Sequence, residues 1–437
     1  MTSVLQADDM LCTASGVRCR VVRLLGSGGQ GEVHEADLDG AAVAIKWYYP
    51  ATATPEQRAT IATLVERGAP SSRFLWPLDL VSADRRDGFG YVMPLRDARF
   101  RSVSELLRRS VITSFRGLAT ASVQLADSFL ALHARGLSYR DISHGNVFFD
   151  PANGDVLICD NDNVAPDGRD AAVMGTPRFM APEIVRGEAL PSTQTDLFSL
   201  AVLLFLFLVN HHPLEGRREA AIHSFDLPAM TRLYGLDPVF IFDPDDTSNR
   251  PVPGLHDNAL VFWPLYPEFL RQRFVGIFTD GLHDPQRRVR ESEWRATAAR
   301  LLDCIVYCPA CGSQVFHDAE VLKAPGQAGS CWSCRTPLTL PPRIRVGKAV
   351  VMLNHDSKLY RHHIDPQAPV DLNMVVGEVV EHPQRPGLWG LRNLTATTWT
   401  ATMADGAVKP VDPGRSVSLA LGTRVSFGTS EGEIRLS

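Results

Sequence analysis

The sequence predicts an α+β fold over residues 19–305, followed by a small cysteine-based metal unit and a C-terminal β-sandwich. Residues 19–49 alternate apolar and polar side chains around glycines, as the strands of hairpins do. From about residue 100 to residue 305 the apolar periodicity is mostly helical. Residues 343–437 contain short β-type runs, most of them separated by Gly and Pro turns.

Composition is that of an ordinary globular protein, with 45% hydrophobic and 21% charged residues, and 437 residues suffice for two to four domains. The net charge of -5 gives no basic surface for nucleic acid. Residues 1–10 contain no basic side chain, which excludes a secretory signal there. The longest apolar run, residues 197–209, is too short to span a bilayer and predicts a buried core helix. We expect a soluble, cytoplasmic protein without nucleic-acid or membrane partners.

A glycine-rich segment at residues 26–33 has the pattern Gly-x-Gly-x-x-Gly-x-Val. Such glycines let the backbone approach phosphates and offer them its N–H groups, although a plain hairpin turn has the same pattern. Lys46 ends an apolar strand fifteen residues after Gly31, where it can pair with the phosphates of ATP or simply reach solvent. The candidate nucleotide-binding residues of this region are Gly26, Gly28, Gly31, Val33, Ala44 and Lys46.

A second polar constellation follows in residues 139–183. Asn146 comes five residues after Asp141, and Asp160 follows an apolar run, residues 156–159, that predicts a strand. Carboxylate and amide oxygens at Asn146 and Asp160 suit Mg²⁺ (or Mn²⁺). Asp141 can accept a hydrogen bond from a hydroxyl nucleophile and act as a general base. Three polar residues in unrelated turns are the alternative, which the motif at residues 175–183 disfavours.

In this order the motifs resemble those of eukaryotic-type protein kinases, including the bacterial Ser/Thr kinases. The resemblance covers residues 19–305 and implies a two-lobed fold, with an N-lobe at 19–95, a C-lobe at 96–305 and a tail at 1–18. It implies ATP and Mg²⁺ in the cleft and a protein substrate with a Ser or Thr hydroxyl, because residues 175–183 read Gly-Thr-Pro-Arg-Phe-Met-Ala-Pro-Glu. The catalytic residues that it implies are Asp141, Lys46, Asn146 and Asp160.

The same resemblance assigns supporting residues. Met93 would gate the adenine pocket, and Leu95 would lie in the hinge that follows. Glu183 would pair with Arg288, and Asp196 would be the buried acid that braces the catalytic loop.

Several residues depart from the family pattern. Tyr139 stands where the family usually has His, and Ser143 stands where Ser/Thr kinases place a lysine against the γ-phosphate, a charge that His144 would replace only in part. Asn161 and Asp162 replace the usual Phe-Gly after Asp160. We interpret Asp162 as a turn acid rather than an additional metal ligand.

The lysine of this family is normally held by a helix glutamate. The predicted helix at residues 55–67 offers Glu56 and Glu66, which lie on different faces, whereas Thr60 fits the phase but cannot pair with a lysine. Glu56 is our candidate for the partner of Lys46.

The alternative to an active kinase is a pseudokinase scaffold that acts through nucleotide or protein binding. A small-molecule kinase with the same fold is a third hypothesis, and the motif at residues 175–183 argues against it.

Two Cys-x-x-Cys pairs separated by 19 residues lie within residues 306–340. In an intracellular chain this spacing favours a closed tetrahedral site for structural Zn²⁺ over disulfides, with unliganded thiols or a redox pair as alternatives. The predicted ligands are Cys308, Cys311, Cys331 and Cys334.

Residues 343–437 resemble a divergent forkhead-associated domain, through the segments 389–395, 411–414 and 421–428. That family reads phosphothreonine with an early Gly-Arg pair and a later Ser-x-x-His. This block lacks Ser-x-x-His, and its Gly414-Arg415 pair comes late. Arg361, Arg392 and Arg424 are candidates for anion contact or are solvated strand ends. We therefore expect this region to dock a signalling protein rather than to use the usual phosphopeptide pocket.

Overall fold

The computed structural model describes residues 3–83, 86–168, 174–318 and 329–436. The chain divides into two compact units, each treated separately below. The first comprises residues 1–113, 124–260 and 273–292, and the second comprises residues 114–123, 261–272 and 293–437.

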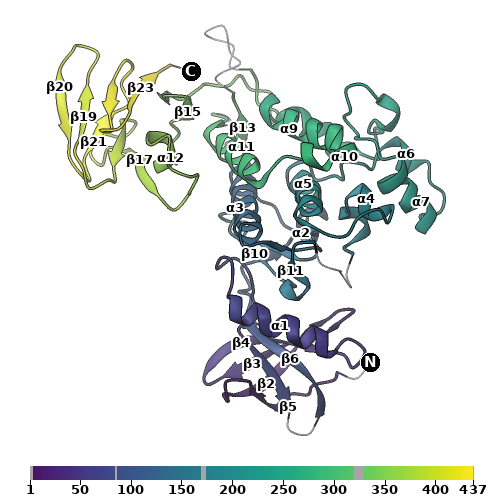
Figure 1. The fold of residues 1–437 in the computed structure, drawn as a ribbon. Coiled ribbons are helices and arrows are strands. Elements are labelled where there is room, and N and C mark those ends of the chain that lie inside the picture. The colour runs from purple at the N-terminus through teal and green to yellow at the C-terminus, as the bar shows by residue number, and fades with distance from the viewer. Residues whose placement is uncertain (1–2, 84–85, 169–173, 319–328, 437) are drawn as a thin grey trace. The chain divides into compact units, whose positions relative to one another are not determined.

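The N-terminal part of the first unit is a closed barrel with the strand order β1-β2-β3-β4-β6-β5. Helix α1 (Pro55–Arg67) packs beside it (Figure 1). The Thr54 side chain caps this helix at its start and Gly68 ends it, which agrees with the bounds predicted from the sequence. The strands are β1 (Met10–Thr13), β2 (Arg18–Ser27), β3 (Gly31–Leu38), β4 (Ala41–Tyr48), β5 (Asp79–Ala83) and β6 (Arg86–Pro94).

Strand β1 lies within residues 1–18, which the sequence suggested as a tail. Leu5 and Leu11 are each 2% exposed and belong to the hydrophobic core of the barrel. Before them, the Ser3 hydroxyl and the Val4 N–H donate hydrogen bonds to Glu32 Oε2, over 2.7 and 2.9 Å. The described residues of this segment therefore form part of the barrel, and the prediction of a tail does not describe them.

The rest of the first unit is mainly helical, around helix α5 (Thr193–Val209), in which residues 195–209 are all buried. This is the core helix predicted from the apolar run. Ser192 and Thr195 form its capping box, and Asn210 ends it in the left-handed conformation. Within the described ranges, no helix is both long enough and apolar enough to cross a membrane.

Short strands and turns that carry the candidate site interrupt these helices. Helices α3, α8, α9 and α11 contain residues of both units. The elements are β7 (Arg101–Ser102), α2 (Val103–Leu107), α3 (Phe115–His133), β8 (Leu137–Ser138), β9 (Val147–Phe149), β10 (Val156–Ile158), η1 (Asn161–Asn163), β11 (Ala165–Pro166), η2 (Pro177–Phe179), α4 (Pro182–Val185), α6 (Arg217–Ala220), α7 (Leu227–Thr231), η3 (Arg232–Leu236), η4 (Thr247–Asn249), α8 (Asp257–Phe262), η5 (Trp263–Leu265), α9 (Glu268–Phe278), α10 (Asp280–His283), η6 (Pro285–Arg287) and α11 (Glu291–Asp303).

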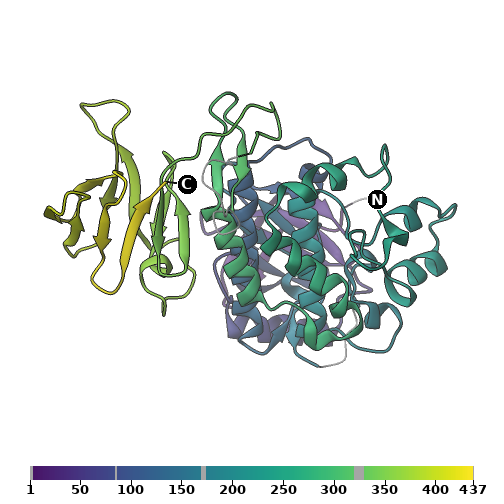
Figure 2. The same cartoon turned by 90° about the horizontal axis from the view of Figure 1, so that it is seen from above.

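The second unit contains the cysteine segment and a β-rich C-terminal region, which is coloured yellow-green to yellow in Figures 1 and 2. The larger sheet has the order β15-β14-β23-β22-β19-β20, and the smaller has the order β16-β17-β18-β21. Both contribute to one core, with Leu391 from the smaller sheet and Trp399 and Ile434 from the larger. The elements are β12 (Ile305–Tyr307), β13 (Gln314–Phe316), β14 (Arg343–Val346), β15 (Ala349–Met352), β16 (Lys358–Tyr360), α12 (Arg361–Ile364), β17 (Val375–Glu381), β18 (Trp389–Asn393), β19 (Trp399–Thr402), β20 (Val408–Val411), β21 (Ser416–Ser418), β22 (Arg424–Ser426) and β23 (Glu431–Arg435).

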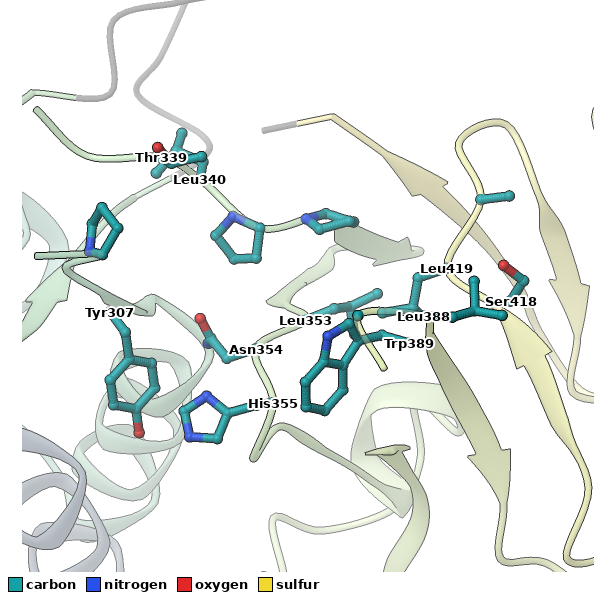
Figure 3. A pocket seen from close by; sticks show the side chains of 15 residues that line it. Tyr307, Thr339, Leu340, Leu353, Asn354, His355, Leu388, Trp389, Ser418 and Leu419 are labelled. Atoms are coloured by element: carbon teal, nitrogen blue, oxygen red, sulfur yellow. The ribbon is translucent and has the colours of Figure 1, made fainter. Parts of the chain in front are cut away.

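A pocket lies within the second unit, between the cysteine segment and the smaller sheet (Figure 3). Its volume is about 640 Å³, and its lining includes the side chains of Tyr307, Pro341, Pro342, Leu388, Trp389 and Leu419. The lining is therefore mainly apolar, although the polar side chains of Asn354 and His355 also contribute to it.

If β1 belongs to the barrel, Leu11→Ala should lower the free energy of unfolding by about 2–5 kcal/mol, because a fully buried side chain is truncated. Met10→Ala is the matched control, since Met10 is 51% exposed, and should change stability by no more than about 0.5 kcal/mol. Denaturant unfolding of the full chain measures both. Equal, small effects would mean that these residues form a tail.

Candidate active site

Lys46 on β4 is a buried cation between two carboxylates. It is 5% exposed, and its Nζ lies 2.8 Å from Asp162 Oδ2 and 3.0 Å from Asp160 Oδ1. It also donates a hydrogen bond to Gln30 Oε1 over 3.2 Å. Burial opposes the charge, but Asp162 and Asp160 together raise the pKa of Lys46 above its ordinary value. The lysine is therefore charged at neutral pH.

Asp162 is not the turn acid that we predicted. Its side chain is fully buried, and its Oδ2 accepts a hydrogen bond from the Tyr48 hydroxyl over 2.6 Å. Gln57 of α1 donates to the Asp162 carbonyl over 3.2 Å and to the Tyr48 hydroxyl over 3.1 Å. The prediction that Glu56 pairs with Lys46 is also wrong, because Glu56 is exposed and forms no ion pair with any described residue.

Asn161, which replaces the phenylalanine of the family pattern, is a buried polar anchor. It is 0% exposed, and its Nδ2 donates to the carbonyls of Leu75 and Ile158 over 2.9 and 3.1 Å. The preceding Asp160 has φ of 54° and ψ of 45°, in the left-handed region. These hydrogen bonds hold the backbone after Asp160 against the segment between α1 and β5, where a phenylalanine would have packed by apolar contact.

Asp141 and Asn146, two of the predicted catalytic residues, lie in the loop between β8 and β9, which the resemblance makes the catalytic loop. Asn146 Nδ2 donates to the Asp141 carbonyl over 2.9 Å and to its Oδ2 over 3.2 Å. The Thr176 hydroxyl donates to Asp141 Oδ1 over 2.7 Å. Burial raises the pKa of Asp141, and the charge of Asp160 adds to that effect, although both hydrogen bonds oppose it. A carboxylate with a raised pKa is a stronger base than a free aspartate.

Asp196 braces this loop from α5, as predicted. Its carboxylate accepts hydrogen bonds from the Tyr139 and Arg140 N–H groups over 2.5 and 2.9 Å. His133 Nε2 lies 3.1 Å from Asp196 Oδ2, and its Nδ1 contacts Glu291 Oε1. Burial opposes protonation, but the hydrogen bonds with the two acids raise the pKa of His133 to about 9. A charged imidazolium thus balances the buried carboxylates behind the loop.

The geometry also shows one more predicted pair and a role for Tyr139 that was not predicted. Arg288 forms a bidentate pair with Glu183, with both N···O distances 2.7 Å, which confirms that prediction. Tyr139 donates its hydroxyl to the Cys159 carbonyl and packs edge-on against Phe129. Tyr139 therefore links the catalytic loop to the residue just before Asp160.

His144 does not replace the missing lysine charge. It stacks on Phe179 with ring centroids 5.4 Å apart, and Ser143 beside it is buried. Burial, together with the nearby charge of Arg178, lowers the pKa of His144 below its ordinary value. At neutral pH the imidazole is uncharged, so a cation is not supplied at this position.

The glycine-rich segment joins β2 to β3. A Cβ on Gly31 would lie 2.2 Å from the Trp47 carbonyl oxygen, so packing alone requires glycine there. A Cβ on Gly26 or Gly28 would meet no atom within 4 Å. Neither position shows a positive φ, so the fold does not demand glycine at these two sites. Open space above the backbone is what an approaching phosphate requires.

The predicted adenine-side residues lie on neighbouring strands. Ala44 on β4 is opposite Met93 on β6, and Val33 on β3 is opposite Lys46. Ala44 and Met93 are 3% and 6% exposed, and Leu95, just after β6, is half-buried. The sheet register therefore places these side chains near one another, while their roles stay predictions.

The cysteine segment of the second unit brings its sulfurs together. Cys308 Sγ is 3.5 Å from Cys334 Sγ, and Cys311 Sγ is 3.7 Å from Cys331 Sγ. The ligand atoms of this cluster all lie within 4.8 Å of one another, and the thiols are free. Zn–S bonds of about 2.3 Å in a tetrahedron place sulfurs about 3.8 Å apart, so the donor set fits a tetrahedral zinc ion.

Residues 19–252 match the protein kinase domain family. The serine/threonine-protein kinase Pkn1 of Myxococcus xanthus is 30% identical over 240 residues, which is 50% of this chain and 32% of that protein. Its relative pkn2 is 28% identical over 216 residues, 46% of this chain and 25% of pkn2. CBL-interacting protein kinase 4 of Oryza sativa subsp. japonica is 33% identical over 118 residues, 24% of this chain and 26% of that protein. The chain thus matches between about a quarter and a third of the length of these curated relatives.

The His133 cluster predicts a pH dependence of stability. Because the pKa of His133 is raised to about 9 in the folded chain, its stabilisation is complete below about pH 6.5 and is lost as the pH rises through about 9. The stability difference between wild type and His133→Gln should shrink across that window, by on the order of 3 kcal/mol. Denaturant unfolding at several pH values measures it, with the exposed His223→Gln as control. A difference that is constant with pH would contradict the assignment.

Proposed function

Because this chain belongs to the protein kinase family, we propose that it transfers the γ-phosphoryl group of ATP to a Ser or Thr hydroxyl of a protein, which includes its own chain. The observation that carries the proposal is the geometry around Asp141. Thr176 and Asn146 fix both of its carboxylate oxygens by hydrogen bonds of 2.7 and 3.2 Å. Such a preoriented carboxylate can accept the hydrogen bond of an incoming hydroxyl.

In this proposal Asp141 accepts the proton of the substrate hydroxyl. Its raised pKa makes it a better acceptor for the substrate proton. Asp196 fixes the backbone of Tyr139 and Arg140, directly before Asp141, so the base keeps its place as the substrate arrives. The Thr176 hydroxyl contacts the same carboxylate, which supports a role for the segment around Thr176 in holding the substrate next to Asp141.

The barrel and the start of the segment after β10 would bind the phosphates of ATP and the divalent cation. The backbone of Gly26 and Gly28 would line the phosphates, and Lys46 would donate to them. Asn146 and Asp160 would hold Mg²⁺ (or Mn²⁺), and the Asp160 side chain is 43% exposed and thus accessible. A bound divalent cation supplies neutralisation of phosphate charge.

We also propose a structural Zn²⁺ bound by the four cysteine thiolates. The sulfur separations of 3.5 and 3.7 Å support a tetrahedral site. The ion would join the two Cys-x-x-Cys turns of a ribbon at residues 306–340, since the hairpin β12–β13 alone is short.

For the C-terminal region we propose a forkhead-associated-like β-sandwich that docks a signalling protein. The common core of the two sheets supports this fold. Two of the candidate anion contacts are already engaged, since Arg392 pairs with Glu378 and Arg361 lies 3.5 Å from Asp365. Arg424 is exposed. Docking by protein contacts therefore fits these side chains better than a phosphopeptide pocket.

Asp141→Asn tests the phosphotransfer proposal. The variant keeps the shape of the side chain but loses the base, so incorporation of label from γ-labelled ATP with Mg²⁺ should fall by about 10²–10⁴-fold. The exposed Asp245→Asn should retain the wild-type rate. Absent label in wild type, or equal label in Asp141→Asn, would favour a pseudokinase scaffold that acts through nucleotide or protein binding.

Metal analysis tests the zinc proposal. The purified chain should contain one zinc ion, and Cys308→Ser should lose it together with thermal stability of the second unit. Cys12→Ser, a half-buried cysteine of the barrel, is the control and should retain the ion. Stoichiometric zinc in Cys308→Ser would rule out the four-cysteine site.

A further inference from the structure

The buried charge of Lys46 requires a partner, and helix α1 does not supply one. In protein kinases the corresponding lysine must pair with a helix glutamate for catalysis. Here the α1 side chain that hydrogen-bonds to Tyr48 and to the Asp162 backbone is Gln57, which is neutral. Its acids Glu56 and Glu66 are both exposed. The carboxylates that contact Lys46 instead come from the segment after β10.

We propose that Asp162 is the positioning residue that holds Lys46 for ATP, in place of a helix glutamate. The inference rests on the proposed function, because it concerns the same nucleotide site. In the family pattern this position, two residues after the metal-binding aspartate, is a glycine. The proposal therefore assigns the counter-charge of Lys46 to a residue that has no charge in that pattern.

Burial distinguishes Asp162 from Asp160 as the lasting partner. The Asp162 side chain is 0% exposed and lies 2.8 Å from Lys46 Nζ, whereas the Asp160 side chain is 43% exposed and lies 3.0 Å away. Asp160 is also the proposed ligand of the divalent cation, which competes with the lysine for that carboxylate. Asp162 is not a proposed ligand of the cation, and because its side chain is 0% exposed, water does not screen its charge.

The orientation of Asp162 is fixed by its neighbours. The Tyr48 hydroxyl donates to the same oxygen that contacts Lys46, over 2.6 Å. Tyr48 and Lys46 lie two residues apart on β4, so their side chains project from the same face of the strand. One carboxylate oxygen thus ties both to the start of the segment after β10.

This arrangement changes what helix α1 controls. Gln57 makes neutral hydrogen bonds of 3.1 and 3.2 Å to Tyr48 and to the Asp162 backbone. Displacement of α1 would break these bonds but would leave the ion pair of Lys46 with Asp162 intact. The lysine is therefore held independently of the helix, unlike a lysine that depends on a helix glutamate.

The surroundings of Asp162 also offer a place on helix α1 where a substitution can introduce a carboxylate as a partner for Lys46. A cavity of about 490 Å³ is lined by Thr60 of α1 as well as by Gln57 and Asp162. Thr60 is the helix position that fits the phase of a glutamate. Thr60→Glu would place a carboxylate at this cavity, which Asp162 also lines.

Kinetics of the full chain test the role. Asp162→Asn should lower kcat/KM for ATP by about tenfold or more and raise KM, because loss of the charge frees Lys46. Thr60→Glu added to Asp162→Asn should recover part of that loss, and Glu56→Gln should behave as wild type. A purely structural role would reduce the folded fraction and thus kcat, and would leave KM unchanged. Wild-type KM in Asp162→Asn, or no recovery with Thr60→Glu, would overturn the proposal.

A stability cycle tests the pair without any catalysis. Lys46→Met should lower the melting temperature of the full chain more when Asp162 is present than in the Asp162→Asn background, because it leaves a buried charge unpaired. The cycle with Glu56→Gln should be additive. If Lys46→Met does not fold, Lys46→Gln replaces it in the same cycle. Additive effects of Lys46 and Asp162 would refute the pairing, whereas absent phosphotransfer with a coupled cycle would refute only the proposed function.

Discussion

A buried cation needs a counter-charge, and this constraint organises the nucleotide side of the site. Lys46 is 5% exposed, and an unpaired ion in such a place would cost several kcal/mol. The carboxylates of Asp160 and Asp162 meet that need at 3.0 and 2.8 Å. Since Lys46 belongs to the barrel and the two acids follow β10, the same contacts join the barrel to the helical half of the first unit.

A second buried charge balance lies behind the catalytic loop. Asp196 holds two backbone N–H groups of the loop, and His133 balances its charge together with that of Glu291. Asp141, the proposed base, is fixed by neutral donors, the Thr176 hydroxyl and the Asn146 amide. Ionic contacts therefore hold the backbone around the site, whereas neutral hydrogen bonds orient the carboxylate of Asp141.

Local sequence signals predicted the local structure well. Helix α1 has its predicted bounds because Thr54 caps its start and Gly68 ends it, and an uninterrupted apolar run marked α5. The pairing of Lys46 escaped prediction because its partner lies more than a hundred residues away and a single buried acid has no periodicity. We expected the partner on α1 by resemblance, and the chain places it elsewhere. Strand β1 escaped because a four-residue strand carries too little pattern.

The central claim is that Asp162 holds Lys46 while Asp160 and Asn146 bind the cation. A crystal structure of the full chain with Mg²⁺ and a non-hydrolysable ATP analogue measures this directly. It should show oxygens of Asp160 and Asn146 at about 2.1 Å from the ion, with Lys46 Nζ on the phosphates and still within hydrogen-bond distance of Asp162. Lys46 paired with Glu56, or Asp162 turned to solvent or bound to the ion, would contradict the account.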